Sequence, residues 1–237
     1  MKILAIDTAT ERCSVALIQA TGEQAAGLQA GEKLPQIAMR SVDTARGHAD
    51  IVLSMVAEVL DEAGTALTEL DGIAYGRGPG AFTGVRIAVG VVQGLAFGAQ
   101  RLTVGISNLA AVAQQVAQPG ERVLVCMDAR MGEIYWATYL CDPQGGLVQE
   151  EVPERVGPPG SIDVGAGPVQ RIVGTGLQVY PHIAARFHNA TAHAGVLPRA
   201  LEIARLAAAE FAAGRGKSAT QAQPVYLRDN VVTRRES

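Results

Sequence analysis

The chain has 237 residues, of which 48% are hydrophobic and 18% charged, a balance typical of a globular protein with one large domain or two small ones. Its net charge of −3 leaves no basic surplus for nucleic-acid binding, so any contact with RNA is expected to be local or indirect. The three cysteines, Cys13, Cys126 and Cys141, form no CxxC pattern, which argues against a zinc site of that type and favours reduced thiols in a cytoplasmic protein.

Apolar segments separated by turn residues run through the first part of the chain. They predict strands at residues 2–7, 12–19, 23–30, 36–42 and 72–76. Helical spacing of apolar residues predicts helices at about 46–63 and 82–99. No signal peptide is expected, because Asp7 follows a short apolar run. The apolar stretch 87–99 is too short to span a bilayer, so no membrane contact is expected.

After Arg101 the pattern of strand and helix begins again. Strands are predicted at 102–107, 122–130, 132–140 and 171–176, and helices at 108–117 and 193–214. Glycines and prolines predict loop at 151–169, the segment 181–195 is also expected to be loop, and residues 224–229 form a short extended tail. The sequence therefore predicts two α/β lobes, residues 1–101 and 102–237, each with a mixed sheet and helices. Whether the last segment returns to the first lobe stays open.

The stretch from Gly76 to Arg86, GRGPGAFTGVR, joins a predicted strand to a predicted helix. Phosphate-binding loops occupy that position. No lysine lies between Gly72 and Gln100, as a P-loop requires, and the glycine spacing is not GxGxxG. Two interpretations stay open: a phosphate cradle assisted by Arg77 and Arg86, or a tight turn that starts a helix.

Two other turns carry charged or hydroxyl side chains. The turn DTATE, which begins at Asp7, either binds phosphate or a metal through water, or caps its own backbone as a hairpin. A second turn brings together Asp128, Arg130 and Glu133, which favours a salt-bridged hairpin over acid–base chemistry. Neither turn supplies a Ser/His/Asp or Cys/His set. No histidine pair has HExxH spacing, so no metal site is expected, and His48 is predicted to begin a helix as a capping or surface residue.

Three glycines in the predicted helix 82–99 are spaced four residues apart. Gly90, Gly94 and Gly98 therefore form one stripe along the helix. Each glycine costs about 1 kcal/mol of helix stability relative to alanine. Close packing would offset this cost, with either the 46–63 helix of the same chain or another protein as the partner.

Several blocks of the sequence, taken together, resemble the bacterial TsaB (YeaZ-type) family. They are ILAIDTATERCSVAL, ARGHADIVLSMV, GRGPGAFTGVRIAVGVVQGLA, GISNLAAVA, DARMGEIYWATY and PVYLRD. The resemblance implies a two-lobed actin/sugar-kinase/Hsp70-like (ASKHA) fold. It also implies a role beside the catalytic paralogue TsaD and the ATPase TsaE in forming N6-threonylcarbamoyladenosine in tRNAs that read ANN codons.

The resemblance also implies which sites are lost and which remain. In the catalytic paralogue an HxxxH pattern binds the metal, but Asn108 and Val112 stand at those positions here, so no metal, cofactor or catalytic residue is expected. The family's nucleotide site would correspond to a weak or vestigial set of residues here, Asp7, Thr8, Thr10, Gly174 and Gly176. Near Asp128 the glycine pair of a phosphate hairpin is missing, which predicts weak or absent ATP binding.

What remains by resemblance is a surface for a partner protein. The helices at about 46–63 and 82–98 would pack against TsaD, or against a second copy of this chain when TsaD is absent, with tRNA contacted indirectly. The predicted interface residues are Ile51, Met55, Val59, Val85, Gly90, Gly94 and Gly98. The expected function is a non-catalytic scaffold or activator. The alternatives are an ATP-dependent kinase or carbamoyltransferase of the same fold and, more weakly, a protease that acts on TsaD.

Overall fold

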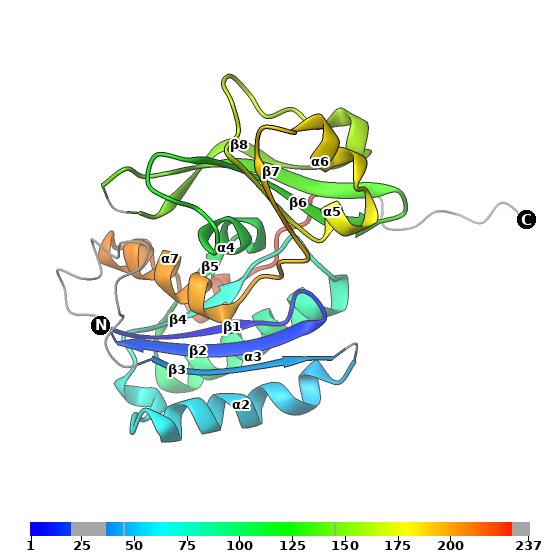
Figure 1. Cartoon of the computed structure of the whole chain (residues 1–237). Coiled ribbons are helices and arrows are strands. Elements are labelled where there is room, and N and C mark those ends of the chain that lie inside the picture. Colours follow the sequence, from blue (N-terminus) through cyan, green and yellow to red (C-terminus); the bar gives the residue numbers. More distant parts are fainter. Residues whose placement is uncertain (20–36, 45, 145, 229–237) are drawn as a thin grey trace, which may run out of the picture.

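The computed structural model describes residues 1–19, 37–44, 46–144 and 146–228, which fold into two α/β lobes (Figure 1). The first lobe contains a five-stranded mixed sheet in the order β3-β2-β1-β4-β5. These strands span Ile37–Asp43, Arg12–Gln19, Lys2–Asp7, Gly72–Gly76 and Leu102–Ile106. β3, β2 and β1 pair antiparallel, whereas β1, β4 and β5 pair parallel. The strand predicted at 23–30 lies outside the described residues.

The second lobe repeats this arrangement without a sequence repeat. Its five-stranded sheet has the order β10-β9-β6-β7-β8. These strands span Thr191–Ala194, Arg171–Gly174, Arg122–Arg130, Glu133–Cys141 and Val148–Gly157. β6, β7 and β8 pair antiparallel, and β6, β9 and β10 pair parallel. In both lobes, three antiparallel strands are thus followed by two parallel ones, as expected for a duplicated two-lobed fold.

The helices form three layers around the two sheets. They are α2, His48–Glu62; α3, Phe82–Ala99; α4, Asn108–Gln114; α5, Gly176–Val179; α6, His182–Arg186; and α7, Ala200–Ala212. α2 and α3 cover the outer face of the first sheet, and α5 and α6 cover that of the second. α4 and α7 lie between the sheets, where one continuous hydrophobic core joins the lobes (Figure 1). Short 3-10 turns complete the fold: η1, Leu67–Glu69; η2, Pro159–Ser161; and η3, Ala219–Gln221.

The lobe limits depart from a division at residue 101. β5 follows that position directly, yet it is the edge strand of the first sheet. α7 also packs against the first sheet, although it lies far along the chain. After α7 the chain continues along the first lobe, where Lys217 exchanges two backbone hydrogen bonds with Thr103. The segment after residue 101 therefore contributes to the cores of both lobes.

Three predicted segments have a different structure from the one expected. The segment 181–195, expected to be loop, contains α6 and β10. Residues 151–157 of the predicted loop 151–169 instead belong to the edge strand β8, and Pro153 is tolerated there because the strand pairs on one side only and its register shifts near that residue. The helix predicted from 193 begins at Ala200, because His193 and Ala194 belong to β10 and Pro198 precedes the first turn. The other predicted helices and strands among the described residues are confirmed within a few positions.

α3 is more apolar than a surface helix usually is. It has 18 residues and a mean hydropathy of 1.4, so by length and composition alone it is sufficient to cross a membrane. In this fold one side of the helix packs on the first sheet, through Val85, Ala88, Val89, Val92 and Ala96. A helix that belongs to the core of a globular protein meets the same criteria.

Candidate functional site

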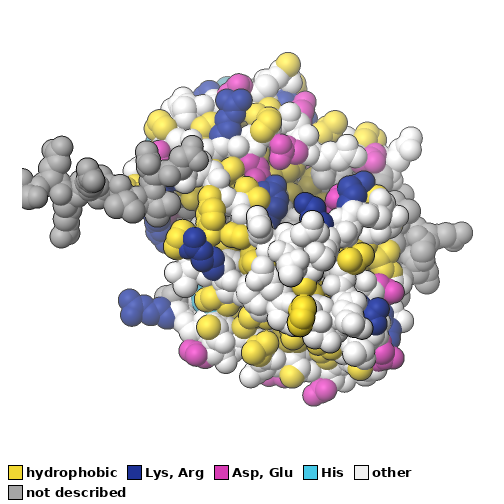
Figure 2. All heavy atoms as spheres, turned by 180° about the vertical axis from the view of Figure 1, so that it is seen from behind, with side chains coloured by type: hydrophobic (Ala, Val, Ile, Leu, Met, Phe, Trp, Pro, Cys, Tyr) yellow, Lys and Arg dark blue, Asp and Glu magenta, His cyan; other side chains and the backbone are white. Residues whose placement is uncertain are grey.

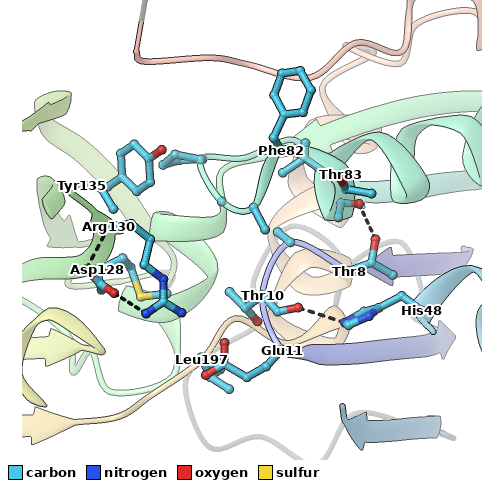
Figure 3. Close-up of a pocket in the computed structure, with 18 of the residues that line it drawn as sticks. Thr8, Thr10, Glu11, His48, Phe82, Thr83, Asp128, Arg130, Tyr135 and Leu197 are labelled. Atoms are coloured by element: carbon cyan, nitrogen blue, oxygen red, sulfur yellow. Dashed lines mark hydrogen bonds and ion pairs between the residues drawn. The ribbon is translucent and has the colours of Figure 1, made fainter. Parts of the chain in front are cut away.

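A cavity of about 1100 Å³ lies between the lobes, and segments of both lobes line it. The first lobe supplies the β1–β2 turn at residues 8–11, the start of α2 at residues 46–50, and residues 79–85, which lead into and form the first turn of α3. The second lobe supplies residues 127–130 of β6, and the C-terminal segment adds residues 225–228. Figure 3 shows Thr8, Thr10 and Glu11 on one side of this space and Asp128, Arg130 and Tyr135 on the other.

Two hydrogen bonds to neighbouring segments, one buried and one partly buried, fix the β1–β2 turn. The hydroxyl of Thr8 donates to the carbonyl of Gly84 at 2.7 Å, and the carbonyl of Thr10 lies 2.9 Å from the ring Nε2 of His48 (Figure 3). His48 is buried at the start of α2, so its predicted surface position is corrected. Thr8 and Thr10 line the cavity, as a nucleotide site there requires. The Thr8 hydroxyl, however, already donates its hydrogen to the Gly84 carbonyl within the protein.

Asp7 lies below the turn and is completely buried. Its Oδ1 accepts a 2.6 Å hydrogen bond from the amide of Asn108, whose own Oδ1 accepts from the backbone N–H of Gly78 at 2.7 Å. Burial raises the pKa of the Asp7 carboxyl to about 6, against the lowering effect of the Asn108 hydrogen bond. Its second oxygen, Oδ2, has no hydrogen-bond partner in the described part of the chain. Asp7 therefore anchors the loop that follows β4.

Asn108 and Val112, which the resemblance places at the histidine positions of the paralogue, lie in the interior of the fold. Asn108 begins α4 and is bound to both Asp7 and Gly78. Val112 is fully buried in the core shared by the two sheets. Within residues 1–19, 37–44, 46–144 and 146–228, no group of three His, Cys, Asp or Glu side chains is arranged to hold a metal ion.

Gly174 and Gly176, two residues of the predicted nucleotide site, are required by packing. A Cβ atom at Gly174 would lie 2.3 Å from the backbone oxygen of Cys126, and one at Gly176 would lie 2.9 Å from it. Gly174 also has a φ of 121°, which an L-amino acid side chain disfavours. The closeness of β6 therefore explains both glycines without a ligand. Between them, the Thr175 hydroxyl accepts a 3.0 Å hydrogen bond from the Asp128 backbone N–H at the cavity wall.

The β6–β7 turn is the salt-bridged hairpin that the sequence predicts. Asp128 pairs with Arg130 at 3.0 Å, and Glu133 pairs with Arg228 of the C-terminal segment. Arg130 and Met131 adopt the left-handed conformation, with φ values of 62° and 56°. Sequence reasoning placed residues 224–229 in a tail and did not expect Tyr226 and Arg228 to line the cavity. The aromatic and basic residues within PVYLRD were the available signal.

The stretch GRGPGAFTGVR is a tight turn whose glycines permit close backbone contact. A Cβ atom at Gly80 would lie 2.5 Å from the Ala9 oxygen, and one at Gly84 would lie 2.1 Å from the Thr8 oxygen. Arg77 pairs with Glu154 of β8 at 3.1 Å, and the Arg86 guanidinium lies 3.3 Å from the centre of the Phe82 ring. Both arginines thus have partners within the chain, which favours the turn interpretation over the phosphate cradle.

The predicted interface residues fall into two groups. Met55 and Val59 of α2 and Val85 of α3 are buried against the first lobe, so their side chains belong to the core rather than to an exposed surface. Ile51 is half-buried at the edge of the same cluster. The exposed group consists of Gly90, Gly94 and Gly98.

The glycine stripe of α3 faces solvent. A Cβ atom added at any of its three glycines would have no atom of the described residues within 4 Å, so none of the described helices packs closely on it. Phe97, which is 75% exposed, lies beside the stripe, and a groove of about 510 Å³ runs between α3 and η3. Figure 2 shows hydrophobic side chains over the lower half of this face, where the first lobe lies.

Comparison with known proteins first defines the class. The family model described as "TsaD: tRNA N6-adenosine threonylcarbamoyltransferase" matches residues 41–234. Together with the fold, this match identifies a two-lobed protein related to threonylcarbamoyltransferases. Among solved structures, "YeaZ from Pseudomonas aeruginosa" is 40% identical, with a TM-score of 0.79 over 95% of this chain and 99% of that chain.

Comparison with named proteins then identifies one family within this class. The chain is 40% identical to "tRNA threonylcarbamoyladenosine biosynthesis protein TsaB" of Escherichia coli K12, over 98% of this chain and 96% of that protein. It is 36% identical to the protein of the same name from Haemophilus influenzae, over 98% of this chain and 95% of that protein. The chain belongs to the TsaB (YeaZ-type) family, and the resemblance seen in the sequence is confirmed.

Proposed function

We propose that this chain is a non-catalytic subunit required for threonylcarbamoyl transfer to the adenosine 3′ of the anticodon in tRNAs reading ANN codons. The observation that carries the proposal is its similarity, over almost the whole chain, to proteins named for threonylcarbamoyladenosine biosynthesis. In this proposal the chain works in the cytoplasm by forming a heterodimer with a TsaD-type catalytic paralogue. It meets a TsaE-type ATPase through the complex and contacts tRNA indirectly.

The state of Asn108 and Val112 supports the non-catalytic part of the proposal. The Asn108 carboxamide is bound within the first lobe to Asp7 and Gly78, and a valine side chain has no atom that ligates a metal. The three cysteines are free thiols buried in the fold, and burial raises the pKa of Cys126 to about 12 and that of Cys13 to about 11. A thiol of this kind is a poor nucleophile at neutral pH, which weighs against a cysteine protease.

The exposed stripe of α3 supports the partner-binding part. Glycines in a helix lower its stability, and a Cβ atom on this stripe would meet no neighbour in the part of the chain that the structure describes. A second helix could approach the α3 backbone closely there, with Phe97 as an exposed aromatic anchor. The same surface would serve self-association when the paralogue is absent.

Reconstitution of tRNA modification tests the proposed role directly. The TsaD-type, TsaE-type and threonylcarbamoyl-adenylate-forming components are combined with and without this chain, and threonylcarbamoyladenosine is measured by mass spectrometry of digested tRNA. We expect product to form only when this chain is present. Equal product without it would refute the activator role.

A substitution on the glycine stripe tests the proposed interface. We expect Gly94→Arg to leave the fold intact, because the position is open, and to weaken the heterodimer ~100-fold by preventing close helix approach. The matched control is Ala212→Arg on α7, which is exposed but lies away from α3. Native mass spectrometry and calorimetry measure the affinity, and a dimer of unchanged strength with a folded Gly94→Arg variant would contradict the assignment.

The cavity between the lobes keeps the second candidate, an ATP-dependent kinase or carbamoyltransferase of the same fold, open to test. Its volume of about 1100 Å³ and its position between the β1–β2 and β6–β7 turns favour a ligand the size of a nucleotide. Calorimetry of the isolated chain with ATP distinguishes the two functions. Tight binding or turnover by the isolated chain would favour the enzyme over the scaffold.

A further inference from the structure

The C-terminal residues 217–228, which we call the strap, follow the first lobe for most of their length. Lys217 pairs with Thr103 of β5, and the carbonyl of Ala222 accepts a 2.8 Å hydrogen bond from the Gln93 side chain of α3. Further on, the backbone N–H of Val225 donates to the carbonyl of Arg77 at 2.8 Å. The strap is thus fixed to the first lobe up to residue 225.

The last described residue of the strap reaches the second lobe. The guanidinium of Arg228 donates to the carbonyl of Ala129 at 3.2 Å and forms an ion pair with Glu133. These two residues flank the β6–β7 turn, whose tip contains the left-handed Arg130 and Met131. Because the Arg228 and Glu133 side chains are only 21% and 33% exposed, solvent screens this pair less than a fully exposed one.

Between these two attachments, the strap meets the first turn of α3. The Tyr226 ring lies 5.7 Å from the Phe82 ring, and the Arg86 guanidinium stacks on both, at 5.1 Å and 3.3 Å from the ring centres. Aromatic and cation–π contacts of this kind are stabilising. Val225 to Arg228 also line the cavity between the lobes, so the strap forms part of its wall.

We propose that the strap is a latch that couples the β6–β7 turn of the second lobe to the first turn of α3 across the cavity. Arg228 holds the turn, Tyr226 holds the helix, and the short chain between them transmits a change at one end to the other. When the latch is released, the turn and the start of α3 both become more mobile, and the cavity opens on that side.

Hydrogen exchange on the full chain tests the latch without any partner. In Arg228→Glu we expect the amides of residues 129–133 and also those of 82–85 to exchange at least about fivefold faster, because breaking the pair loosens both ends. The double variant Glu133→Arg with Arg228→Glu restores an ion pair of opposite polarity and should return both regions to within about twofold of the wild type. Faster exchange at 129–133 alone would overturn the proposal, as would no change in either region or failure of the double variant to restore protection.

A second variant, at Tyr226, tests the contact of the strap with α3, and it replaces the first test if Arg228→Glu does not fold. Tyr226→Ala removes the ring stack and leaves the Arg228–Glu133 pair in place. The latch predicts faster exchange at 129–133 in this variant, whereas a purely local role for Tyr226 predicts a change only near Phe82 and would contradict the proposal.

One consequence of the latch rests on the proposed function. If α3 binds a TsaD-type partner, reciprocity requires that the partner change the protection of the β6–β7 turn, and that Arg228→Glu change the affinity for the partner. Hydrogen exchange in the isolated chain tests the latch alone, and reconstitution of tRNA modification tests the proposed function alone. Failure of the latch can therefore be distinguished from failure of the proposed function.

Discussion

The two ends of α3 use glycine for opposite reasons. Before and within its first turn, Gly80 and Gly84 lie so close to the β1–β2 turn that no larger residue fits. Further along, Gly90, Gly94 and Gly98 have nothing near them. Both sets look alike in the sequence, yet the first is required by the fold, whereas the second lowers helix propensity and meets no close neighbour among the described residues. In the proposed function, this second set leaves the backbone of α3 open to a partner helix.

The largest effect on stability is expected where the backbone of α3 at Gly84 lies against the β1–β2 turn at Thr8. Gly84→Ala would place a Cβ atom 2.1 Å from the carbonyl oxygen of Thr8, which is backbone and has little freedom to move. We expect a loss of ~3 kcal/mol or more in the free energy of unfolding, measured by urea denaturation. A loss below about 1 kcal/mol would show that the β1–β2 turn is not held as closely as described.

A somewhat smaller effect is expected from Asp7, which anchors the loop that follows β4. Its pKa is raised from 3.8 to about 6, so the folded state holds the proton more tightly than the unfolded state does. Its contribution to stability is therefore full below pH 3.8 and is lost as the pH rises to about 6, a change of roughly 3 kcal/mol. The stability of the wild type relative to Asp7→Asn should fall by most of this amount between pH 4 and pH 7, as measured by urea denaturation at each pH.

Asp43 provides a control of opposite sign for the Asp7 experiment. The hydrogen bond from Arg12 lowers the pKa of this exposed carboxyl, so its contribution is lost as the pH falls. Relative to Asp43→Asn, the wild type should therefore gain stability as the pH rises. If Asp7→Asn and Asp43→Asn showed the same direction, the assignment of a raised pKa to Asp7 would be wrong.

The smallest effect is expected at the open end of α3, and it has the opposite direction. Gly90→Ala adds a methyl group in open space and should stabilise the isolated chain by about 0.5–1 kcal/mol, through higher helix propensity. Thermal and urea unfolding measure this gain. A loss of stability would mean that the stripe packs against part of this chain, and the contrast between the two sets of glycines would disappear.

The sequence was sufficient for most of the elements and for the family, because apolar periodicity and turn residues act locally. It was insufficient where the outcome depends on neighbours. Pro153 predicts loop by its residue type, although an edge strand tolerates proline, and the helical pattern extends to His193, although that residue pairs with β9. Met55, Val59 and Val85 follow helical spacing, but spacing alone does not distinguish the face on the sheet from the face in solvent. The cavity wall formed by Tyr226 and Arg228 depends on a chain return that no local pattern reveals.

The edge strand β8 has a consequence for how copies of this chain can meet. An unpaired strand edge is a template for pairing with a strand of another molecule. Here Pro153 removes one backbone donor, and the strand also carries the charged residues Glu150, Glu151, Glu154 and Arg155. Both features disfavour continuous sheet formation across molecules at this edge. At high concentration, the second lobe is thereby protected from strand-to-strand aggregation on this side.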